Sequence, residues 1–258
     1  MTKPLESFKT KLLGKEFETN TCGKCVVIDY HNCQEVTVMF YDPVYITKCE
    51  YGNLRRGNVK NHIYPSYYGK GYMGVGKYSS KDRKIYDMWA KMLERCYNEK
   101  VRDKQPTYLV VTVCDEWLDF QNFAAWCEAQ DFFNAKDDKG RPYQLDKDIL
   151  IKGNRVYSPE TCCFVPKDIN LLLLTSKKAR GDYPIGVSYL KRGGVFRADL
   201  SINGKLKYLG SFRSSEEAFQ AYKRAKESYV KDVANKWKDR IDLRIYQALL
   251  QYEVNVDD

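Results

Sequence analysis

Apolar and polar residues alternate over three short segments near the start of the chain. These segments are rich in β-branched and aromatic side chains and span residues 24–30, 35–41 and 44–49. His31–Asn32 and Asp42–Pro43 place turn-forming residues between them, as in strands joined by tight turns. Because a few strands must close on themselves to bury an apolar face, we expect a small β-barrel-like domain over residues 1–68.

The spacing of apolar residues becomes helical in the middle of the chain. Residues 82–98 and 116–129 carry apolar side chains three or four positions apart, which predicts two helices with one apolar face each. Their aromatic residues, Trp89 and Phe120 among them, are therefore expected in a core. Gly and Tyr are dense before the first helix, and we interpret residues 69–79 as a linker.

Alternation returns in the last third of the chain, where residues 185–190, 195–202 and 206–212 predict three strands. Asn203–Gly204 is the preferred two-residue hairpin turn. Ser214 or Ser215 can cap a helix that follows. We therefore expect a three-stranded antiparallel sheet with a helix packed on one face, and a last helix over residues 241–254.

These patterns together predict an α+β protein of three modules. A β-rich module over residues 1–68 is followed, after the linker, by a mixed module over residues 80–176. The sheet and its helices form the third module, residues 183–258. Between the second and third modules, residues 176–182 have the composition of a basic linker.

Charge and composition narrow the classes of partner. The chain has 258 residues and a formal net charge of +9 at pH 7. A basic globular chain favours nucleic acid over the weaker alternative, an anionic membrane surface, and no small-molecule substrate is indicated. No run of about 18 apolar residues occurs, and the first residues lack the apolar core of a signal peptide. We expect a cytoplasmic protein that does not enter a membrane.

The chain has 9 cysteines and no secretion signal. An odd number of cysteines in this context indicates reduced and mostly buried thiols rather than a disulfide framework. Cys22 and Cys25 form a C-x-x-C pair. No second pair completes a zinc site, so a structural zinc ion is the less favoured interpretation.

The candidate chemistry is concentrated in residues 143–170. Asp146, Lys147 and Asp148 follow a short apolar stretch, and Asn170 lies in a predicted helix after a second apolar stretch. This order predicts a strand, a loop, a strand and a helix. A carboxylate on the first strand and an amide on the helix could converge on one Mg²⁺ or Mn²⁺ ion. Such an ion stabilises charge on the phosphate when a phosphodiester is cleaved.

At these positions the sequence resembles the HNH, or His-Me finger, endonucleases of bacteriophages, many of which are homing enzymes. The matching residues are Leu145, Asp146, Asp148, Gly153, Tyr157 to Glu160, Cys162 and Asn170, with further matches at Trp89 to Tyr97 and Val113 to Phe123. The resemblance implies a ββα-metal domain, with Asp146 and Asn170 as metal ligands. Where that family has a catalytic His this chain has Lys147, so Lys147 or Asp148 would have to replace it.

The last module is similar to the Apetala-type, or ethylene-response-factor, DNA-binding domain. The matching residues are Gly186, Val187, Phe196, Ala198, Leu200, Tyr208 to Gly210, Phe212, Glu216 to Ala218, Ala221 and Tyr222. The resemblance implies a sheet that enters the major groove of duplex DNA. Alternation places Arg197 and Ser201 on the face opposite the apolar one, and we expect Tyr208 beside Arg197.

Further basic residues are candidates for phosphate contacts. Lys191 and Arg192 lie at one predicted hairpin turn, and Lys205 and Lys207 lie on the side of their strand opposite Tyr208. In the first module Arg55 and Arg56 lie in a basic loop over residues 53–60, which either binds phosphate or is simply solvated.

Three functions stay open at this point. The chain is a metal-dependent DNA endonuclease of the phage HNH type with an atypical active site, or a catalytically inactive DNA-binding regulator. The third alternative is a phage accessory or inhibitor protein that acts on another protein. The absent His favours the second hypothesis over the first.

Overall fold

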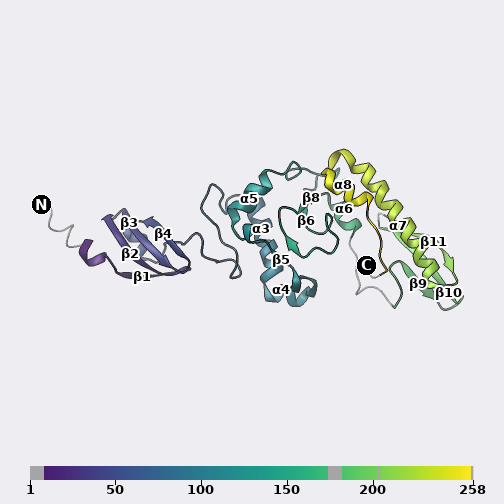
Figure 1. Ribbon diagram of the computed structural model, residues 1–258, viewed down its shortest axis with the longest axis horizontal. Helices are drawn as coiled ribbons and strands as arrows, with labels where there is room; N and C mark the ends of the chain where they lie inside the picture. The colour runs from purple at the N-terminus through teal and green to yellow at the C-terminus, as the bar shows by residue number, and fades with distance from the viewer. Residues whose placement is uncertain (1–8, 174–181, 203, 257) are drawn as a thin grey trace. The chain divides into compact units, whose positions relative to one another are not determined.

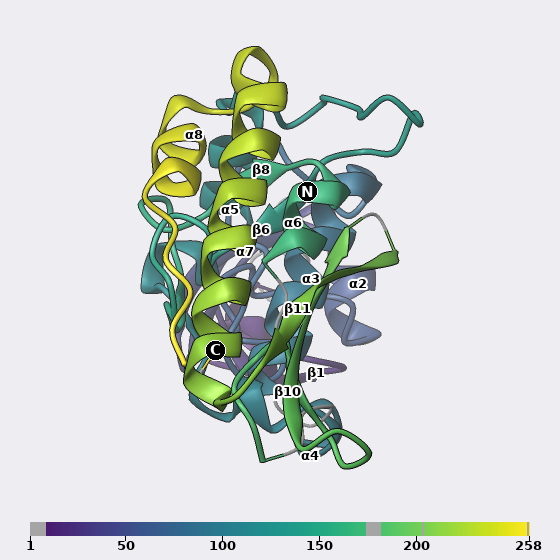
Figure 2. The ribbon, with the colours of Figure 1, turned by 90° about the vertical axis from the view of Figure 1, so that its right-hand side faces the viewer.

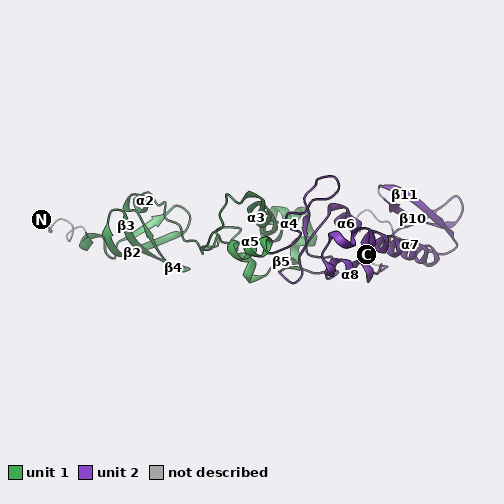
Figure 3. Ribbon diagram, turned by 90° about the horizontal axis from the view of Figure 1, so that it is seen from above, with its two compact units in different colours: residues 1–129, 156–158 green, residues 130–155, 159–258 purple. Residues whose placement is uncertain are grey.

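The computed structural model describes residues 9–173, 182–202, 204–256 and 258 (Figure 1). The chain mixes helices with several small sheets, so the predicted α+β class is confirmed. Its contacts divide it into two compact units, coloured separately in Figure 3. Unit 1 contains Met1–Ala129 and Val156–Ser158, and unit 2 contains Gln130–Arg155 and Pro159–Asp258. Among the described helices, none is long and apolar enough to span a membrane.

Unit 1 begins with a four-stranded antiparallel sheet in the order β1-β2-β3-β4. The strands are β1 (Glu16–Thr19), β2 (Gly23–Asn32), β3 (Glu35–Tyr41) and β4 (Val44–Cys49), and helix α2 (Tyr51–Arg55) follows. The expected barrel is wrong, because within the described residues β1 and β4 are the two edges of an open sheet. Leu12, Leu54 and Val59 join the core on its inner face, so the apolar face is covered without closure.

The remainder of unit 1 is mainly helical. Its elements are α3 (Arg83–Tyr97), α4 (Glu99–Lys104), η1 (Pro106–Val110), β5 (Thr112–Val113), η2 (Asp115–Leu118) and α5 (Phe120–Glu128). The two predicted helices are present, but the second is divided because the Asp119 side chain accepts the backbone N–H of Gln121 and caps α5. Trp89, Phe120 and Phe123 are fully buried, which confirms that they belong to a core.

Residues 69–79, interpreted above as a linker, pack against α3 and α5. Tyr72 donates its backbone N–H to the carbonyl of Leu118 over 2.9 Å. A side chain at Gly71 would collide with Trp89 and Leu93, so the glycine is required for this close approach. The composition predicted a solvated connection, whereas here glycines allow the backbone to lie directly on aromatic side chains.

Unit 2 contains the strand–loop–strand–helix predicted for the central motif. Strand β6 (Gln144–Asp146) pairs antiparallel with β8 (Cys163–Val165), and helix α6 (Lys167–Leu172) follows at once. Between them, β7 (Val156–Tyr157) belongs to unit 1, where it pairs in parallel with β5. Of the predicted basic linker over residues 176–182, all but Asp182 lies outside the described residues.

The second part of unit 2 is the predicted sheet-and-helix module. Its sheet has the order β11-β10-β9, and Figure 2 shows helix α7 running along one face of it. The elements are β9 (Val187–Leu190), β10 (Val195–Ile202), β11 (Lys205–Phe212), α7 (Ser215–Trp237), η4 (Lys238–Arg240) and α8 (Leu243–Leu250). The Ser214 hydroxyl accepts the N–H of Glu217 and caps α7, as predicted. Asn203 of the predicted turn is outside the described residues.

Candidate functional site

Asp146 ends strand β6 and turns its carboxylate back onto the chain. Its Oδ1 accepts the backbone N–H groups of Asp148 and Ile149, each over 2.8 Å. Among the described residues these are the hydrogen bonds of the carboxylate, so Oδ2 is available to a cation. Burial raises the pKa of Asp146, because it outweighs the two N–H donors and the nearby Lys147 charge, which act in the opposite direction.

Lys147, the residue in place of the family's catalytic His, is buried with a relative exposure of 8%. Its Nζ donates to both carboxylate oxygens of Asp148, over 2.7 and 2.8 Å, and to the carbonyl of Asn154 over 2.9 Å. The Asn154 amide donates in return to the carbonyl of Lys147. Lys147 and Asp148 therefore bind each other and hold the loop in place. The role of either residue as general base stays a prediction, and in this arrangement the Lys147 ammonium group holds the Asp148 carboxylate.

Asn170 lies on helix α6 and contacts strand β6. Its Nδ2 donates to Oε1 of Gln144 over 3.0 Å. Gln144 and Asp146 are two positions apart on β6 and so share a face of that strand. Asn170 therefore contacts the face of β6 to which Asp146 belongs, and a shared metal ion stays a prediction.

This pair fits a hard cation only as a partial ligand set. Asp146 Oδ2 and the Asn170 side-chain oxygen are the oxygen donors that Mg²⁺ and Mn²⁺ prefer, and such ions keep several waters or share phosphate oxygens. In the described part of the chain, no group of three or more His, Cys, Asp and Glu side chains could hold a metal. Both histidines, His31 and His62, belong to unit 1, so the β6–β8–α6 segment contains neither.

The three-stranded sheet has two chemically different faces, as alternation predicted. On β10, Ala198 and Leu200 are buried against α7. Residues paired across neighbouring strands have their side chains on the same face of the sheet. On the face opposite Ala198 and Leu200 these paired residues are Leu190, Ser188, Val195, Arg197, Asp199, Ser201, Leu206, Tyr208 and Ser211. We call this set the outer face. It exposes three large side chains, Leu190 at 39%, Leu206 at 74% and Tyr208 at 56%.

Arg197 is the central cation of the outer face, and it is not free. Its Nη2 donates to Asp199 Oδ1 over 2.8 Å, and its Nε lies 2.7 Å from Asp199 Oδ2. The guanidinium also stacks over the Tyr208 ring at 5.2 Å, as predicted for neighbours on one face. Hydrogen bonds from Arg197 to Asp199 raise the pKa of the arginine. The sequence analysis missed this ion pair, although the two residues are two positions apart on one strand.

The lysines and arginine expected at phosphates lie around the two hairpin turns. Lys191 and Arg192 are exposed just after β9. Lys205 and Lys207 pair with Ile202 and Leu200, so they lie on the side of β11 opposite Tyr208, as predicted, and both are exposed.

In unit 1 the segment predicted as a basic loop begins as helix α2. Arg55 is the last residue of this helix and Arg56 is its C-cap. Both are exposed, and Arg56 donates to the Asn53 side chain over 2.7 Å. The start of the predicted loop is therefore helical, but the guanidinium groups of Arg55 and Arg56 are exposed as a phosphate contact would require.

Cys22 and Cys25 contribute to the core of the first sheet. Cys25 is fully buried, and burial, followed by the nearby Cys49, raises its pKa to about 11. Cys25 therefore packs as a small apolar side chain in this core. No disulfide joins any of the cysteines, and most of them are buried, as expected for reduced thiols.

Comparison with protein families, with curated proteins and with solved structures finds no match for this chain.

Proposed function

We propose that the chain binds double-stranded DNA through the outer face of its β9–β11 sheet. The observation that carries the proposal is the Arg197–Tyr208 pair, presented on an exposed face whose opposite side is packed on α7. A sheet supported in this way is rigid. An arginine on it can reach O6 and N7 of guanine, and Tyr208 can pack on a sugar or a thymine methyl group.

The positive charges around the sheet also favour DNA as the partner. Lys191, Arg192, Lys205 and Lys207 are exposed at the two hairpin ends, where they can contact phosphates on either side of the groove. The net charge of +9 adds a sequence-independent attraction that weakens with salt. The likeness of this module to the Apetala-type domain supports the same assignment.

A second candidate function is DNA cleavage by an HNH-like endonuclease of phage type. The observation that favours it is the contact of Asn170 with Gln144, on the face of β6 to which Asp146 belongs. Asp146 and Asn170 would both be ligands of one Mg²⁺ or Mn²⁺ ion, which when bound stabilises charge on the phosphate. The alternative for the same residues is a catalytically inactive regulator, or an accessory or inhibitor protein, because Lys147 is committed to Asp148.

Fluorescence anisotropy on labelled duplexes tests DNA binding in the full chain. Arg197→Ala should reduce preference among duplexes by about tenfold, the effect of losing one bidentate base contact. Lys207→Ala should weaken all duplexes alike and reduce the dependence on salt, because it removes a phosphate contact. If both variants keep the wild-type affinity for every duplex, the sheet does not bind DNA.

Nicking of supercoiled plasmid in Mg²⁺ or Mn²⁺ separates the endonuclease from the inactive regulator. Nicking by the wild type that disappears in Asp146→Asn supports the enzyme. Duplex binding with no nicking in either metal supports the regulator.

A further inference from the structure

Unit 2 contains a cleft on the side of the β9–β11 sheet that faces α7. Its volume is about 560 Å³, which lies within the range typical of small-molecule sites. The lining comes from the loop before β6, from α6, from the β10–β11 hairpin and from α7: Lys139, Arg141, Asp168, Leu171, Leu172, Leu200, Ser201, Gly204, Tyr222, Lys226 and Tyr229. Ser201, at the edge of the cleft, is the one lining residue that also belongs to the outer face. The lining contains neither Asp146 nor Asn170.

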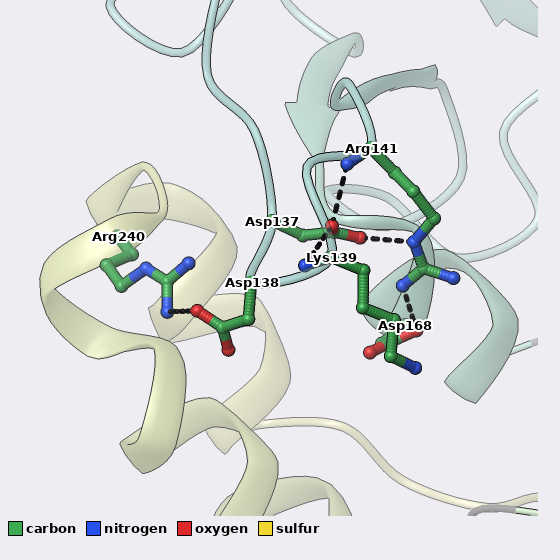
Figure 4. A network of polar contacts seen from close by, with 6 residues as sticks. All are labelled: Asp137, Asp138, Lys139, Arg141, Asp168 and Arg240. Atoms are coloured by element: carbon green, nitrogen blue, oxygen red, sulfur yellow. Dashed lines mark hydrogen bonds and ion pairs between the residues drawn. The ribbon is translucent and has the colours of Figure 1, made fainter.

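The cleft has a basic rim. Among the lining residues, Lys139 and Arg141 from the loop before β6 and Lys226 from α7 contribute three positive charges, against the single carboxylate of Asp168. Figure 4 shows the Arg141 guanidinium between two carboxylates, with Nε 2.6 Å from Asp137 Oδ2 and Nη2 2.6 Å from Asp168 Oδ1. This network holds the Arg141 side chain in one position at the rim. Binding of a ligand there would therefore cost little side-chain entropy at Arg141.

Lys226 is the most enclosed of the three cations. Its Nζ donates to the carbonyl of Leu172 over 2.6 Å, and burial lowers its pKa. The Leu172 carbonyl is neutral and does not balance the positive charge of the Lys226 ammonium group. This charge would therefore stabilise an anion that binds in the cleft.

The floor of the cleft is apolar and aromatic. Leu172, Leu200 and Tyr222 are buried, with relative exposures of 9%, 2% and 6%, and Tyr229 is half-buried beside them. Apolar and aromatic side chains next to a basic rim match a nucleotide, whose base is an aromatic ring and whose phosphate is an anion.

We propose that this cleft binds one nucleotide, with its base on the leucine and tyrosine floor and its phosphate at Lys139, Arg141 and Lys226. The nucleotide is either a unit of an unpaired DNA strand or a free mononucleotide, and the two share the same chemistry. This site is additional to the duplex-binding outer face. The partner expected from sequence is double-stranded DNA, so a single-nucleotide site goes beyond that expectation.

The test measures anisotropy of a short fluorescein-labelled oligothymidylate with the full chain. Leu171 lines the cleft and is 51% exposed, so the fold tolerates a polar residue there. Leu171→Glu should weaken binding about fivefold, the effect of one added like charge near a surface. Leu171→Gln, its uncharged match, should bind nearly as the wild type does.

A second pair of variants removes charge instead of adding it. Lys139→Ala should weaken binding of the same probe about threefold. Lys136→Ala, at an exposed position of the same loop outside the cleft lining, should leave binding unchanged. Thymidine monophosphate that competes with the probe identifies a free nucleotide as ligand. Probe binding without competition by the mononucleotide identifies an unpaired strand.

The proposal is overturned if the wild type binds neither probe nor mononucleotide, or if Leu171→Glu and Lys139→Ala bind the probe no more weakly than their matched controls. Duplex affinity measured on the same variants should not change. A loss of duplex binding in Arg197→Ala with intact probe binding would thus report on the outer face alone.

Discussion

Two aspartates of unit 2, Asp137 and Asp146, have nearly the same local structure and opposite surroundings. In each, Oδ1 accepts two backbone N–H groups from the turn that follows. Asp137 receives them from Lys139 and Arg141, each over 2.9 Å. Both turns satisfy backbone donors in the way that Asp commonly does.

The difference lies in the second oxygen. Asp137 Oδ2 is bound by Arg141, which reaches on to Asp168 (Figure 4). Burial alone would raise the pKa of Asp137, but the N–H donors and the guanidinium of Arg141 together lower it. Asp146 has the same kind of backbone donors and no such guanidinium, and burial raises its pKa. A carboxylate that is hydrogen-bonded to an arginine is structural, whereas one that is hydrogen-bonded to backbone N–H groups alone is a candidate ligand.

The largest effect should come from making the same change at both positions. Asp137→Asn keeps the shape of the side chain and removes the charge that Arg141 requires, so it should lower the thermal midpoint clearly. Asp146→Asn keeps the Oδ1 acceptor and removes a disfavoured charge, so it should leave the midpoint unchanged or raise it. Differential scanning fluorimetry at pH 7 measures both. A comparable loss in the two variants would show that Asp146 is also structural.

The next effect is the response to metal. If Asp146 is a ligand, Mn²⁺ should stabilise the wild type by about 2.7 kcal/mol at 100 times its dissociation constant. Asp146→Asn should show no such gain, while the milder Asn170→Ala should keep part of it. Thermal midpoints across a Mn²⁺ titration measure this, with Lys136→Ala as control. An equal rise in wild type and Asp146→Asn would place the metal elsewhere.

The dependence on pH should have opposite signs at the two aspartates. The pKa of Asp137 is lowered on folding, so its contribution is present above the ordinary value of about 3.9 and is lost as pH falls through the folded pKa. The pKa of Asp146 is raised, so folding stability falls as pH rises from about 3.9 through the folded pKa. The urea midpoint of each Asn variant is subtracted from that of the wild type at each pH from acid to neutral. The change of this difference with pH gives one slope for Asp137 and one for Asp146. Slopes of one sign would refute the contrast.

The smallest effect extends the comparison to a third carboxylate, Asp199, which is paired with Arg197. Asp199→Asn should raise duplex affinity about threefold, because it frees the guanidinium and removes a negative charge from the outer face. In the Arg197→Ala background the gain should shrink, since part of it acts through the arginine. An unchanged gain would mean that Arg197 takes no part in binding.

Features with a short sequence period were predictable. The face of each residue on β10 followed from strict alternation, and Ala198 and Leu200 are indeed buried. The helical stripe that contains Trp89 followed from spacing alone. The antiparallel strands β6 and β8 and the helix α6 that follows them were predicted from a motif of known order.

Features that depend on distant segments were not predictable. The first sheet stays open because Leu12 and Leu54 cover it, and neither residue belongs to the strand pattern. The cleft joins Lys139, Leu171 and Lys226, which no local period relates. Even the nearby Arg197–Asp199 ion pair was not predictable. Alternation places both side chains on one face, but their rotamers decide whether they form a hydrogen bond.

The most direct test of DNA binding by the outer face is photo-cross-linking from single positions of the full chain. A benzophenone side chain at Leu206, on the outer face and 74% exposed, should cross-link to a labelled duplex. The same group at Lys231, an exposed position on α7, should not. Cross-linking from position 231 with none from position 206 would contradict the account, because duplex DNA would then contact the helix and leave the sheet face uncovered.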